Sequence, residues 1–365
     1  MRIVYVINSL AVGGAERQVL ALADRMAARG HSVALMVLLP SEIDDWTTSL
    51  DVVRFNLHKT PLGIARALSK GARFIRAFRP DLVHSHSFHA NILARLFKLS
   101  YRKANVISTI HNVYEGGWLR MVAYRWSDRW CNLTTAVSTV AAERFTRLKA
   151  VPRSKCYVLA NAIDTSVFTP DAARRERMRK QRGLADEFVW LAVGRIVPAK
   201  DFANLLRAFK EVDGAAPRTQ LWIAGDNSNA GKTVDHALAT EGVHWLGLCL
   251  DIPALLDAAD GFVLSSAWEG MPLALGEAMA MQKPFVATDV GGVRELAGET
   301  GVVVPAKDAS ALAQAMLGLM GLSAEVRQAM GRAGRVRIAG GFSMEARADE
   351  WESLYTAVIQ KEARS

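Results

Sequence analysis

The chain has 365 residues, which is long for one domain and ample for two. Half of the residues are hydrophobic and 22% are charged, so a packed core is expected and wholesale disorder is excluded. The net charge of +9 makes nucleic acid, an anionic membrane surface and phosphorylated small molecules candidate partners.

The first half of the sequence alternates short apolar runs with longer amphipathic patterns. Near-continuous β-branched runs, typical of strands buried on both faces, predict strands at Ile3–Ile7, Val33–Leu39, Leu82–His84, Val106–Ile110 and Leu133–Val137. Helical periodicity predicts helices at Glu16–Ala28, Leu62–Phe78, Ala90–Leu99, Leu119–Trp130 and Val140–Leu148. This alternation is typical of a doubly wound parallel sheet.

Residues 161–187 interrupt the alternation with an arginine-rich run, which we interpret as a domain linker with room for a short polar helix. Beyond it the expected strands are Val189–Val193, Gln220–Ala224, Val243–Leu246, Gly261–Leu264, Phe285–Ala287 and Val302–Val304. The expected helices are Phe202–Val212, Ile252–Ala258 and Leu273–Met281, followed by helical patterns from Ser310 onwards. We therefore expect an α/β protein with two Rossmann-like domains, residues 1–165 and 166–342, that face an interdomain cleft.

The first loop that bears a chemical motif is Gly13-Gly14-Ala15-Glu16, between the first strand and the first helix. Glycines let the backbone approach a ligand closely, and the N–H groups at a helix start attract anions. The motif lacks the GxGxxG spacing, so a dinucleotide site is disfavoured. A ligand loop and a plain tight turn both remain open.

A second motif lies where the strand Val189–Val193 ends. Gly194 and Arg195 follow this strand, and Lys200 comes five residues after the arginine. Two cations that converge at the carboxyl end of a strand suit a diphosphate, which an arginine binds in a forked geometry. We favour this interpretation over a surface pair at a helix start, because cations are electrostatically unfavourable there.

The strongest motif is Glu269-Gly270-Met271-Pro272-Leu273-Ala274-Leu275-Gly276-Glu277, after the strand Gly261–Leu264. Pro272 suits the first position of a helix, which places Glu269 on the preceding loop and Glu277 one to two turns into the helix. The N–H groups at the helix start can receive phosphate oxygens. Carboxylates beside them can accept hydrogen bonds from the hydroxyls of a sugar or a ribose.

Glu269 and Glu277, with seven residues between them, resemble the paired-glutamate motif of the retaining family-4 glycosyltransferases (glycosyl transferases group 1), which have the GT-B fold. The resemblance runs along nearly the whole chain. Further segments that carry it are the glycine loop at residues 13–16, the interdomain segment at 161–170, the clamp at 194–201 and the element at 289–295. Ala162 and Gln282 stand where the family usually has glycine. By the same resemblance, residues 343–361 form a helix that returns to the N-terminal domain.

The resemblance implies transfer of a sugar from a nucleoside diphosphate donor, with retention at the anomeric carbon and without a metal or other cofactor. Arg195 and Lys200 would neutralise the charge that grows on the leaving diphosphate. Glu277 would hold the ribose hydroxyls and Glu269 the donor sugar. The expected donor-binding residues are Gly13, Gly14, Arg195, Lys200, Glu269, Gly270, Met271, Leu273, Ala274 and Glu277.

Histidines follow two of the predicted strands in the first half. The resemblance places a histidine in the position of His111 near the donor sugar and the acceptor, so we expect it to position substrate or to polarise the transition state. The alternative is that His111 only caps its loop. His84 and His86 are candidates for acceptor contact or for a polar cleft wall. We expect no metal site, because no clustered Asp/His spacing is visible and the three cysteines lack a CxxC spacing.

Charge is distributed unevenly between the two halves. Residues 1–165 hold 23 Lys and Arg against 11 Asp and Glu, a balance of +12, whereas residues 166–365 hold 22 against 25. On the helix Leu62–Phe78 the cations Arg66, Lys70 and Arg73 are expected on one face. The expected apolar stripe on the opposite face is Leu62, Ala65, Leu68, Ala72 and Ile75.

A second cluster combines indole rings with cations. It consists of Trp118, Arg120, Tyr124, Arg125, Trp126, Arg129 and Trp130. Such a segment suits a membrane interface, so one hypothesis is that the N-terminal domain docks on an anionic cytoplasmic leaflet and takes a lipid-linked or polysaccharide acceptor. The alternative, which we weigh equally, is that the tryptophans belong to the core and the charges are solvated.

The leading hypothesis is therefore a cytoplasmic hexosyltransferase of bacterial cell-surface polysaccharide or lipopolysaccharide biosynthesis, with peripheral attachment to the inner face of the cytoplasmic membrane left open. Its partners would be a nucleotide-sugar donor and a glycan or lipid-linked acceptor. Nucleic acid is not expected as a partner, because the charge lies on a nucleotide-type fold without a recognition motif. Two alternatives are a nucleotide-sugar 2-epimerase, which shares the two-domain architecture, and a non-catalytic subunit that binds a sugar nucleotide.

Overall fold

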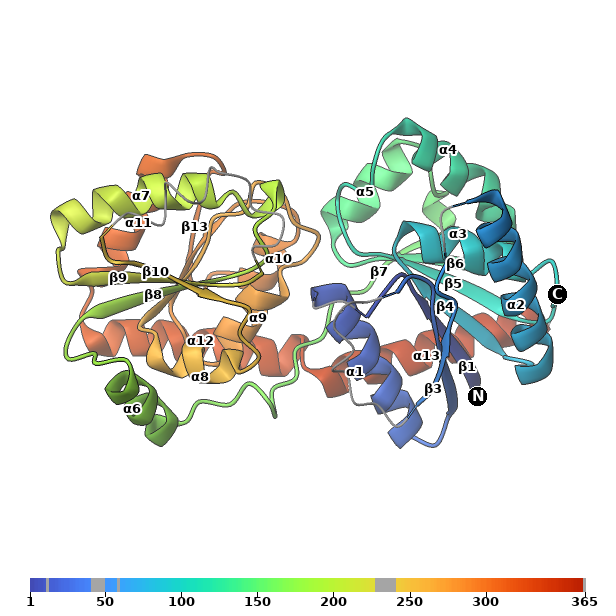
Figure 1. The fold of residues 1–365 in the computed structure, drawn as a ribbon, viewed down its shortest axis with the longest axis horizontal. Helices are drawn as coiled ribbons and strands as arrows, with labels where there is room; N and C mark the ends of the chain where they lie inside the picture. Colours follow the sequence, from blue (N-terminus) through green and yellow to red (C-terminus); the bar gives the residue numbers. More distant parts are fainter. Residues whose placement is uncertain (11–12, 41–49, 58–59, 227–240, 364–365) are drawn as a thin grey trace. The chain divides into compact units, whose positions relative to one another are not determined.

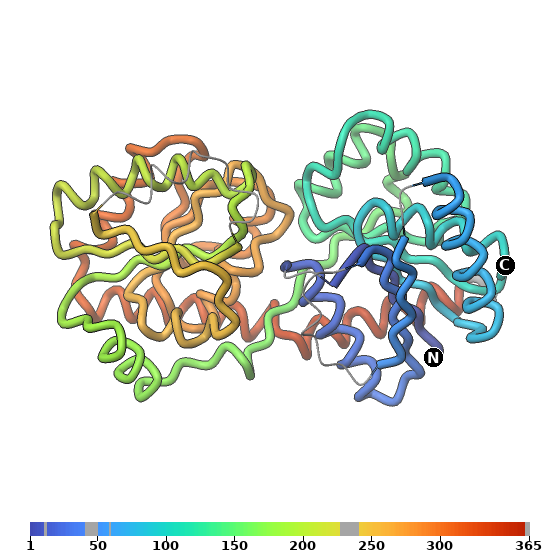
Figure 2. Tube along the Cα trace, viewed as in Figure 1, coloured from blue at the N-terminus to red at the C-terminus, as the bar shows by residue number. Residues whose placement is uncertain are grey.

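The computed structural model describes residues 1–10, 13–40, 50–57, 60–226 and 241–363. The chain folds into two compact units, of which the first comprises Met1–Ala162 and Met344–Ser365 and the second Ile163–Ser343 (Figure 1). The break at Ala162 lies three residues before the boundary that we expected at residue 165. The last helix, α13 (Met344–Ala363), is drawn in red beside the blue elements of the first unit in Figure 2.

The first unit is built on a parallel sheet of seven strands in the order β3-β2-β1-β4-β5-β6-β7. The strands are β1 (Arg2–Ile7), β2 (Ser32–Val37), β3 (Asp51–Arg54), β4 (Leu82–His86), β5 (Asn105–Ile110), β6 (Leu133–Ala136) and β7 (Cys156–Val158). Ile3 and Tyr5 of β1 pack in one apolar cluster, and Val4 and Val6 pack in another. Because successive side chains of a strand point to opposite faces, this sheet is buried on both.

Helices cover both faces of this sheet. They are α1 (Gly14–Ala28), α2 (Pro61–Phe78), α3 (Phe88–Phe97), α4 (Trp118–Ser127), α5 (Thr139–Arg147) and α13. α1 and α13 pack on the face of Tyr5, for example through Val19 and Trp351, whereas α2 and α3 pack on the other through Ile75 and Phe97. The single helix expected at Leu119–Trp130 is α4 followed by a 3-10 turn at Asp128–Trp130.

The helix α2 buries only part of the predicted stripe. Ile75 is buried as predicted, whereas Leu62 and Ala65 are exposed, and Gly71 is buried instead. The cause is the close approach of α3, since a Cβ at Gly71 would lie 2.2 Å from Cζ of Phe97. The absence of a side chain lets the Phe97 ring reach the backbone of α2, and this contact turns the buried face away from Leu62.

The second unit repeats the architecture with six parallel strands in the order β10-β9-β8-β11-β12-β13. The strands are β8 (Phe188–Val193), β9 (Thr219–Ala224), β10 (Val243–Gly247), β11 (Gly261–Leu264), β12 (Phe285–Thr288) and β13 (Val302–Val304). The helices are α6 (Ala172–Gln181), α7 (Phe202–Ala215), α8 (Ile252–Ala258), α9 (Leu273–Ala280), α10 (Val293–Ala297), α11 (Ala309–Met320) and α12 (Ala324–Gly341). The predicted α/β class with two doubly wound sheets is confirmed.

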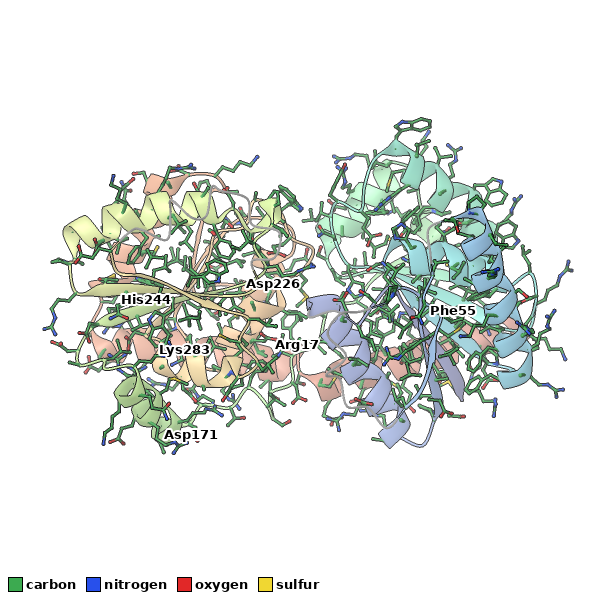
Figure 3. All side chains as sticks on the ribbon, viewed as in Figure 1. Arg17, Phe55, Asp171, Asp226, His244 and Lys283 are labelled. Carbon is green, nitrogen blue, oxygen red and sulfur yellow. The ribbon has the colours of Figure 1, made fainter. Side chains whose placement is uncertain are left out.

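The arginine-rich segment that we interpreted as a linker contains α6, and this helix docks on the second unit. Asp171, labelled in Figure 3, caps α6 by accepting the backbone N–H groups of its first turn. Arg175 and Arg179 contact the carboxylate of Asp260 at 2.6 and 3.1 Å. The same carboxylate accepts the N–H of Val189 in β8. These arginines are therefore fixed in ion pairs that attach α6 to the sheet.

Among the helices of the described residues, none is by itself long and apolar enough to cross a bilayer. The helices α11 and α12, which differ in direction by 112°, pass that test of length and composition only as a bent pair.

Candidate functional site

Three loops emerge at the carboxyl edge of the second sheet. Because β8, β11 and β12 are parallel neighbours, the segments that follow them leave the sheet on the same side. β8 leads to Gly194, Arg195 and a 3-10 turn at Pro198–Lys200. β11 leads to residues 265–272, and β12 leads to residues 289–292. This edge therefore gathers the predicted cation clamp, the first acid of the glutamate motif and the glycine-rich element after it.

Lys200 and Glu269 are in direct contact at this edge. The Nζ atom of Lys200 lies 2.5 Å from Oε1 of Glu269, and the Ser266 hydroxyl donates to the same oxygen at 2.7 Å. The exposed fractions of the two side chains are 21% and 12%, so the ion pair is largely shielded from water. A charged group that is hydrogen-bonded twice and shielded is held in one orientation. The sequence pattern did not point to Ser266.

Further hydrogen bonds join the loops to one another. Ser265 donates its hydroxyl to the carbonyl of Lys200 at 2.9 Å, and the N–H of Ala267 donates to the carbonyl of Ala199 at 2.8 Å. From the β12 side, the Thr288 hydroxyl donates to the carbonyl of Ser266 at 2.7 Å. The loop after β11 is thus hydrogen-bonded to the loop after β8 and to the end of β12. These bonds hold Glu269 in a fixed position at the edge of the sheet.

Glycine at position 291 permits the closest approach between two of these loops. Gly291 has a φ of +53°, and a Cβ there would lie 2.0 Å from the carbonyl oxygen of Glu269. Its neighbour Gly292 donates its N–H to the carbonyl of Gly270 at 2.8 Å. The glycines after β12 therefore serve to bring the backbone of that loop onto the Glu269–Gly270 backbone.

Arg195 is exposed, and no carboxylate of the described residues forms an ion pair with it. The side chain of Lys200 passes close to the preceding residue, since a Cβ at Gly194 would lie 3.0 Å from its Cε. The structure therefore brings Lys200 against the Gly194–Arg195 backbone. It records no direct contact between Arg195 and Lys200 or Glu269.

The helix α9 carries the second half of the glutamate motif. We predicted Pro272 as the first helical residue. In the structure Pro272 is the N-cap residue and the helix begins one position later, at Leu273. Leu273 and Ala274 are half-buried, Met271 is buried, and Glu277 in the second turn is 6% exposed. The first-turn N–H groups of a helix have no partner within the helix, so those of α9 are available to an anion.

In the first unit, the glycine loop begins α1. Gly13 is the N-cap residue with an extended backbone, and Gly14 is the first helical residue. A Cβ at Gly13 would lie 2.3 Å from a carboxylate oxygen of Glu16. A side chain at position 13 would thus displace the carboxylate of Glu16 from its place beside the N-cap residue.

Two of the three predicted histidines lie on β4 and the third, His111, follows the neighbouring strand β5, but only His111 is accessible. His84 is fully buried, and its ring nitrogens contact the hydroxyls of Tyr355 and Thr109, each at 2.7 Å. We therefore reassign His84 from the acceptor side to the core, where it is held by a helix 271 residues further along the chain. His86 is 1% exposed and contacts the partly exposed His111 through a 2.9 Å bond between ring nitrogens.

All three imidazole rings are neutral at neutral pH. Burial lowers the pKa of His111 to about 4. Burial also lowers the pKa of His84 and of His86 well below the ordinary value, and the neighbouring histidines add to the effect. A neutral ring has one donor and one acceptor nitrogen, so in the His86–His111 bond one ring donates and the other accepts.

Glu115, which the sequence pattern did not single out, holds the loop of His111. Its carboxylate accepts the backbone N–H of His111 at 3.2 Å and the hydroxyl of Tyr124 at 2.7 Å. Burial raises the pKa of Glu115 to about 7, although both hydrogen bonds oppose the shift. The sequence shows only that an acid follows His111 by four residues. It does not show that this acid contacts Tyr124, which lies on the next helix, α4.

Within the described parts of the chain, no group of three or more His, Cys, Asp or Glu side chains is arranged to hold a metal ion.

Comparison with known protein families gives two matches that together account for most of the chain. Residues 12–167 match the family described as Glycosyltransferase Family 4, and residues 187–321 match Glycosyl transferases group 1. The first match covers most of the first unit and the second lies within the second unit. Each of the two doubly wound sheets therefore has its own family match.

Among characterised relatives, the glycogen synthase of Mycobacterium tuberculosis is 29% identical over 96% of this chain and 90% of its own length. The UDP-Gal:alpha-D-GlcNAc-diphosphoundecaprenol alpha-1,3-galactosyltransferase of Escherichia coli is 26% identical over 79% of this chain and 78% of its own length. Among solved structures, HepE of Anabaena in complex with UDP and glucose superimposes with a TM-score of 0.88 at 19% identity, over 98% of this chain and 100% of that one. The last likeness confirms the predicted two-domain fold.

Proposed function

The chain belongs to the group 1, family 4 glycosyltransferases of the GT-B fold, and we propose that it moves a sugar from a nucleoside diphosphate to a glycan or lipid-linked acceptor with retention at the anomeric carbon. The proposed setting is the cytoplasm, in the synthesis of a bacterial cell-surface polysaccharide such as lipopolysaccharide. The observation that carries the proposal is the shielded Lys200–Glu269 pair beside the exposed Arg195.

The cations would act on the leaving group. As the bond between the anomeric carbon and the diphosphate oxygen lengthens, negative charge grows on the diphosphate, and fixed cations stabilise it. Arg195 has no acid partner among the described residues, so its guanidinium is available for a forked contact with phosphate. Lys200 is oriented by Glu269 and would meet the same group. In this proposal the two side chains do the electrostatic work without a bound metal.

The carboxylates would hold the two sugars of the donor. Oε1 of Glu269 receives both Lys200 and Ser266, which leaves Oε2 to accept a hydroxyl of the transferred sugar. Glu277 lies in the second turn of α9, close to the N–H groups that would receive phosphate oxygens. From there it would accept the ribose hydroxyls. Neither glutamate is proposed as a nucleophile, so departure of the diphosphate and attack by the acceptor occur on the same face of the sugar.

The relatives guide the choice of substrates to test. HepE binds UDP and glucose, and the Escherichia coli relative uses UDP-Gal with an acceptor carried on diphosphoundecaprenol. We therefore propose a UDP-sugar as the first donor to examine and a polyprenyl-diphosphate-linked saccharide as the first acceptor. The glycogen synthase relative supports a glycan as the other acceptor class.

The proposal is tested first with the purified protein and a panel of donors. UDP-, GDP- and ADP-sugars should be compared by the shift in melting temperature, since a bound ligand stabilises the native state. Transfer with the best donor should then be followed in the presence of EDTA, and the anomeric configuration of the product determined by NMR. Retained configuration and undiminished activity in EDTA are expected. An inverted product, or activity lost on chelation and restored by a divalent ion, would refute the mechanism.

A matched pair of variants then tests the cation clamp. Arg195→Ala should reduce transfer by about 10²–10³-fold, as expected for loss of one group that stabilises the transition state. Arg218→Ala removes another exposed arginine of the second unit, which pairs with Asp186, and should leave transfer unchanged. A 2-epimerised sugar in place of a new glycosidic bond would identify an epimerase. Donor binding without transfer or hydrolysis for every donor and acceptor would identify a non-catalytic subunit.

A further inference from the structure

The helix α4 presents its large apolar side chains to solvent. Trp118, Leu119, Val122 and Trp126 are 72%, 66%, 50% and 57% exposed. At 3.6 residues per turn these four positions fall within an arc of about 100° on the helix surface. They therefore form one continuous apolar strip, which we call the α4 strip. The alternative that Trp118 and Trp126 belong to the core is wrong.

The inner face of α4 explains why its apolar side chains are free to point outward. The buried residues of this helix are Tyr124 and Ser127. The Tyr124 hydroxyl donates to Glu115 and accepts from Asn91, at 2.7 and 2.9 Å, and buried Arg95 donates to the carbonyl of Tyr124 and the hydroxyl of Ser127. The Tyr124 ring and Met121 also pack in an apolar cluster with Phe145. Polar and apolar contacts of its inner face therefore attach the helix to its unit, and the α4 strip lies on the opposite, exposed side.

Cations border the α4 strip at its carboxyl end. The guanidinium of Arg129 contacts the rings of both Trp126 and Trp130, 4.5 and 4.4 Å from their centroids, and the two rings contact each other edge to face. Beside it, Arg125, Lys149 and Arg153 line a hollow at the ends of α4 and α5. All three are exposed, and none forms an ion pair with an acid of the described residues. We call these three residues the basic hollow.

Cations outnumber acids around this surface. Residues 114–155 contain eight Lys and Arg but only three Asp and Glu, a balance of +5. Of these acids, Glu115 binds the His111 loop and Tyr124, Asp128 lines the basic hollow and pairs with Lys155 at 3.1 Å, and Glu143 is exposed. The segment that carries the α4 strip therefore has a positive balance that suits an anionic partner.

The side chains of the α4 strip and the basic hollow indicate which kind of partner this surface binds. Tryptophan is the side chain that favours the boundary between hydrocarbon and lipid headgroups, and arginine beside it reaches the phosphates. A helix with a narrow apolar face and flanking cations lies in the plane of a membrane surface. We propose that the α4 strip and the basic hollow together form a docking site for an anionic lipid bilayer.

This site concerns the first unit alone and does not depend on the donor chemistry. Its test uses the purified full chain without donor or acceptor, so its failure would leave the proposed transfer reaction standing. The experiment is flotation with vesicles of phosphatidylcholine, with and without phosphatidylglycerol, at low and high salt. Binding is expected only with phosphatidylglycerol and should weaken as salt rises, because salt screens exposed charges.

Two sets of variants separate the apolar and the charged parts. Trp118→Ala with Trp126→Ala should abolish flotation, because it removes the apolar contact. Arg125→Ala, Lys149→Ala and Arg153→Ala together should weaken binding to anionic vesicles by about 100-fold, at about fivefold for each cation. All five side chains are partly or fully exposed, so unchanged melting temperatures are expected.

Matched controls come from the second unit. Leu250→Ala with Val336→Ala removes apolar side chains that are 71% and 72% exposed, and Arg177→Ala, Lys180→Ala and Arg218→Ala removes three exposed cations. Neither control should change flotation. Absence of binding by the unmodified protein, equal binding to neutral vesicles, or equal loss in the controls and in the α4 variants would overturn the proposal.

Discussion

Replacing Gly291 with alanine tests whether two loops of the candidate site hold each other in place. A Cβ at this position would lie 2.0 Å from the carbonyl oxygen of Glu269 and 3.0 Å from that of Gly270. Both atoms belong to the backbone, so no side chain can rotate out of the way. To reach an ordinary van der Waals separation, the Glu269 carbonyl must move by about 1.4 Å.

The size of the effect on stability follows from two contributions. The left-handed backbone at φ +53° costs about 1 kcal/mol for alanine relative to glycine. Separation of the loops breaks the hydrogen bond from Gly292 to Gly270, which contributes about 1 kcal/mol. We therefore expect the free energy of unfolding to fall by at least about 2 kcal/mol. The displaced loop also carries Glu269 away from Lys200, so donor affinity should fall by about tenfold or more.

Gly183 provides the matched control in the same unit. It has a φ of +66°, and a Cβ there would have no atom within 4 Å. Gly183→Ala should therefore lose only the backbone contribution of about 1 kcal/mol and keep its donor affinity. Urea unfolding gives the free energies, and donor titration gives the affinities. Equal destabilisation by the two substitutions, or unchanged donor affinity in Gly291→Ala, would refute the idea that Gly291 positions Glu269.

Three further predictions concern stability. Because burial raises the pKa of Glu115 to about 7 from 4.5, the folded protein binds its proton more tightly than the unfolded chain. As pH rises from 4.5 to about 7, the free energy of unfolding of the unmodified protein should thus fall relative to that of Glu115→Gln. Urea unfolding at each pH measures both values, and curves of this free energy against pH that run parallel for the two proteins would contradict the prediction. Tyr355→Phe removes the hydroxyl that contacts His84 and should cost about 1–3 kcal/mol in urea unfolding. Asp260→Ala leaves Arg175 without its acid, so amides of α6 should exchange hydrogen faster while those of α7 do not.

Most of the fold was predictable because residues next to each helix or strand in the sequence mark where it begins and ends. The bounds of α8, β11 and β13 agree with those expected, since turn residues or charges flank each of these apolar runs. The strands β3 and β7 were missed because they are short edge strands, four and three residues long, whose side chains are only partly buried. The helix α10, with five residues, is too short to show a helical period.

The candidate site was predictable where a loop follows a strand, because parallel strands bring such loops to one edge. That rule predicts Lys200 and Glu269 at the same edge, and the two side chains are in contact there. It failed for His84, whose partner Tyr355 lies 271 residues further along the chain. A local sequence pattern cannot predict a contact between residues so far apart in the sequence. The sequence left two interpretations of the tryptophans in α4 open, and the 72% and 57% exposure of Trp118 and Trp126 excludes a place in the core.

The return of α13 to the first unit has a consequence for biosynthesis. Trp351 and Tyr355 fill the apolar cluster over β1, yet they leave the ribosome after the whole second unit has been made. Until then the nascent N-terminal sheet has one incompletely covered face, with Tyr5 deprived of its hydroxyl partner. The core of the unit that is synthesised first is therefore completed only after the second unit has been synthesised.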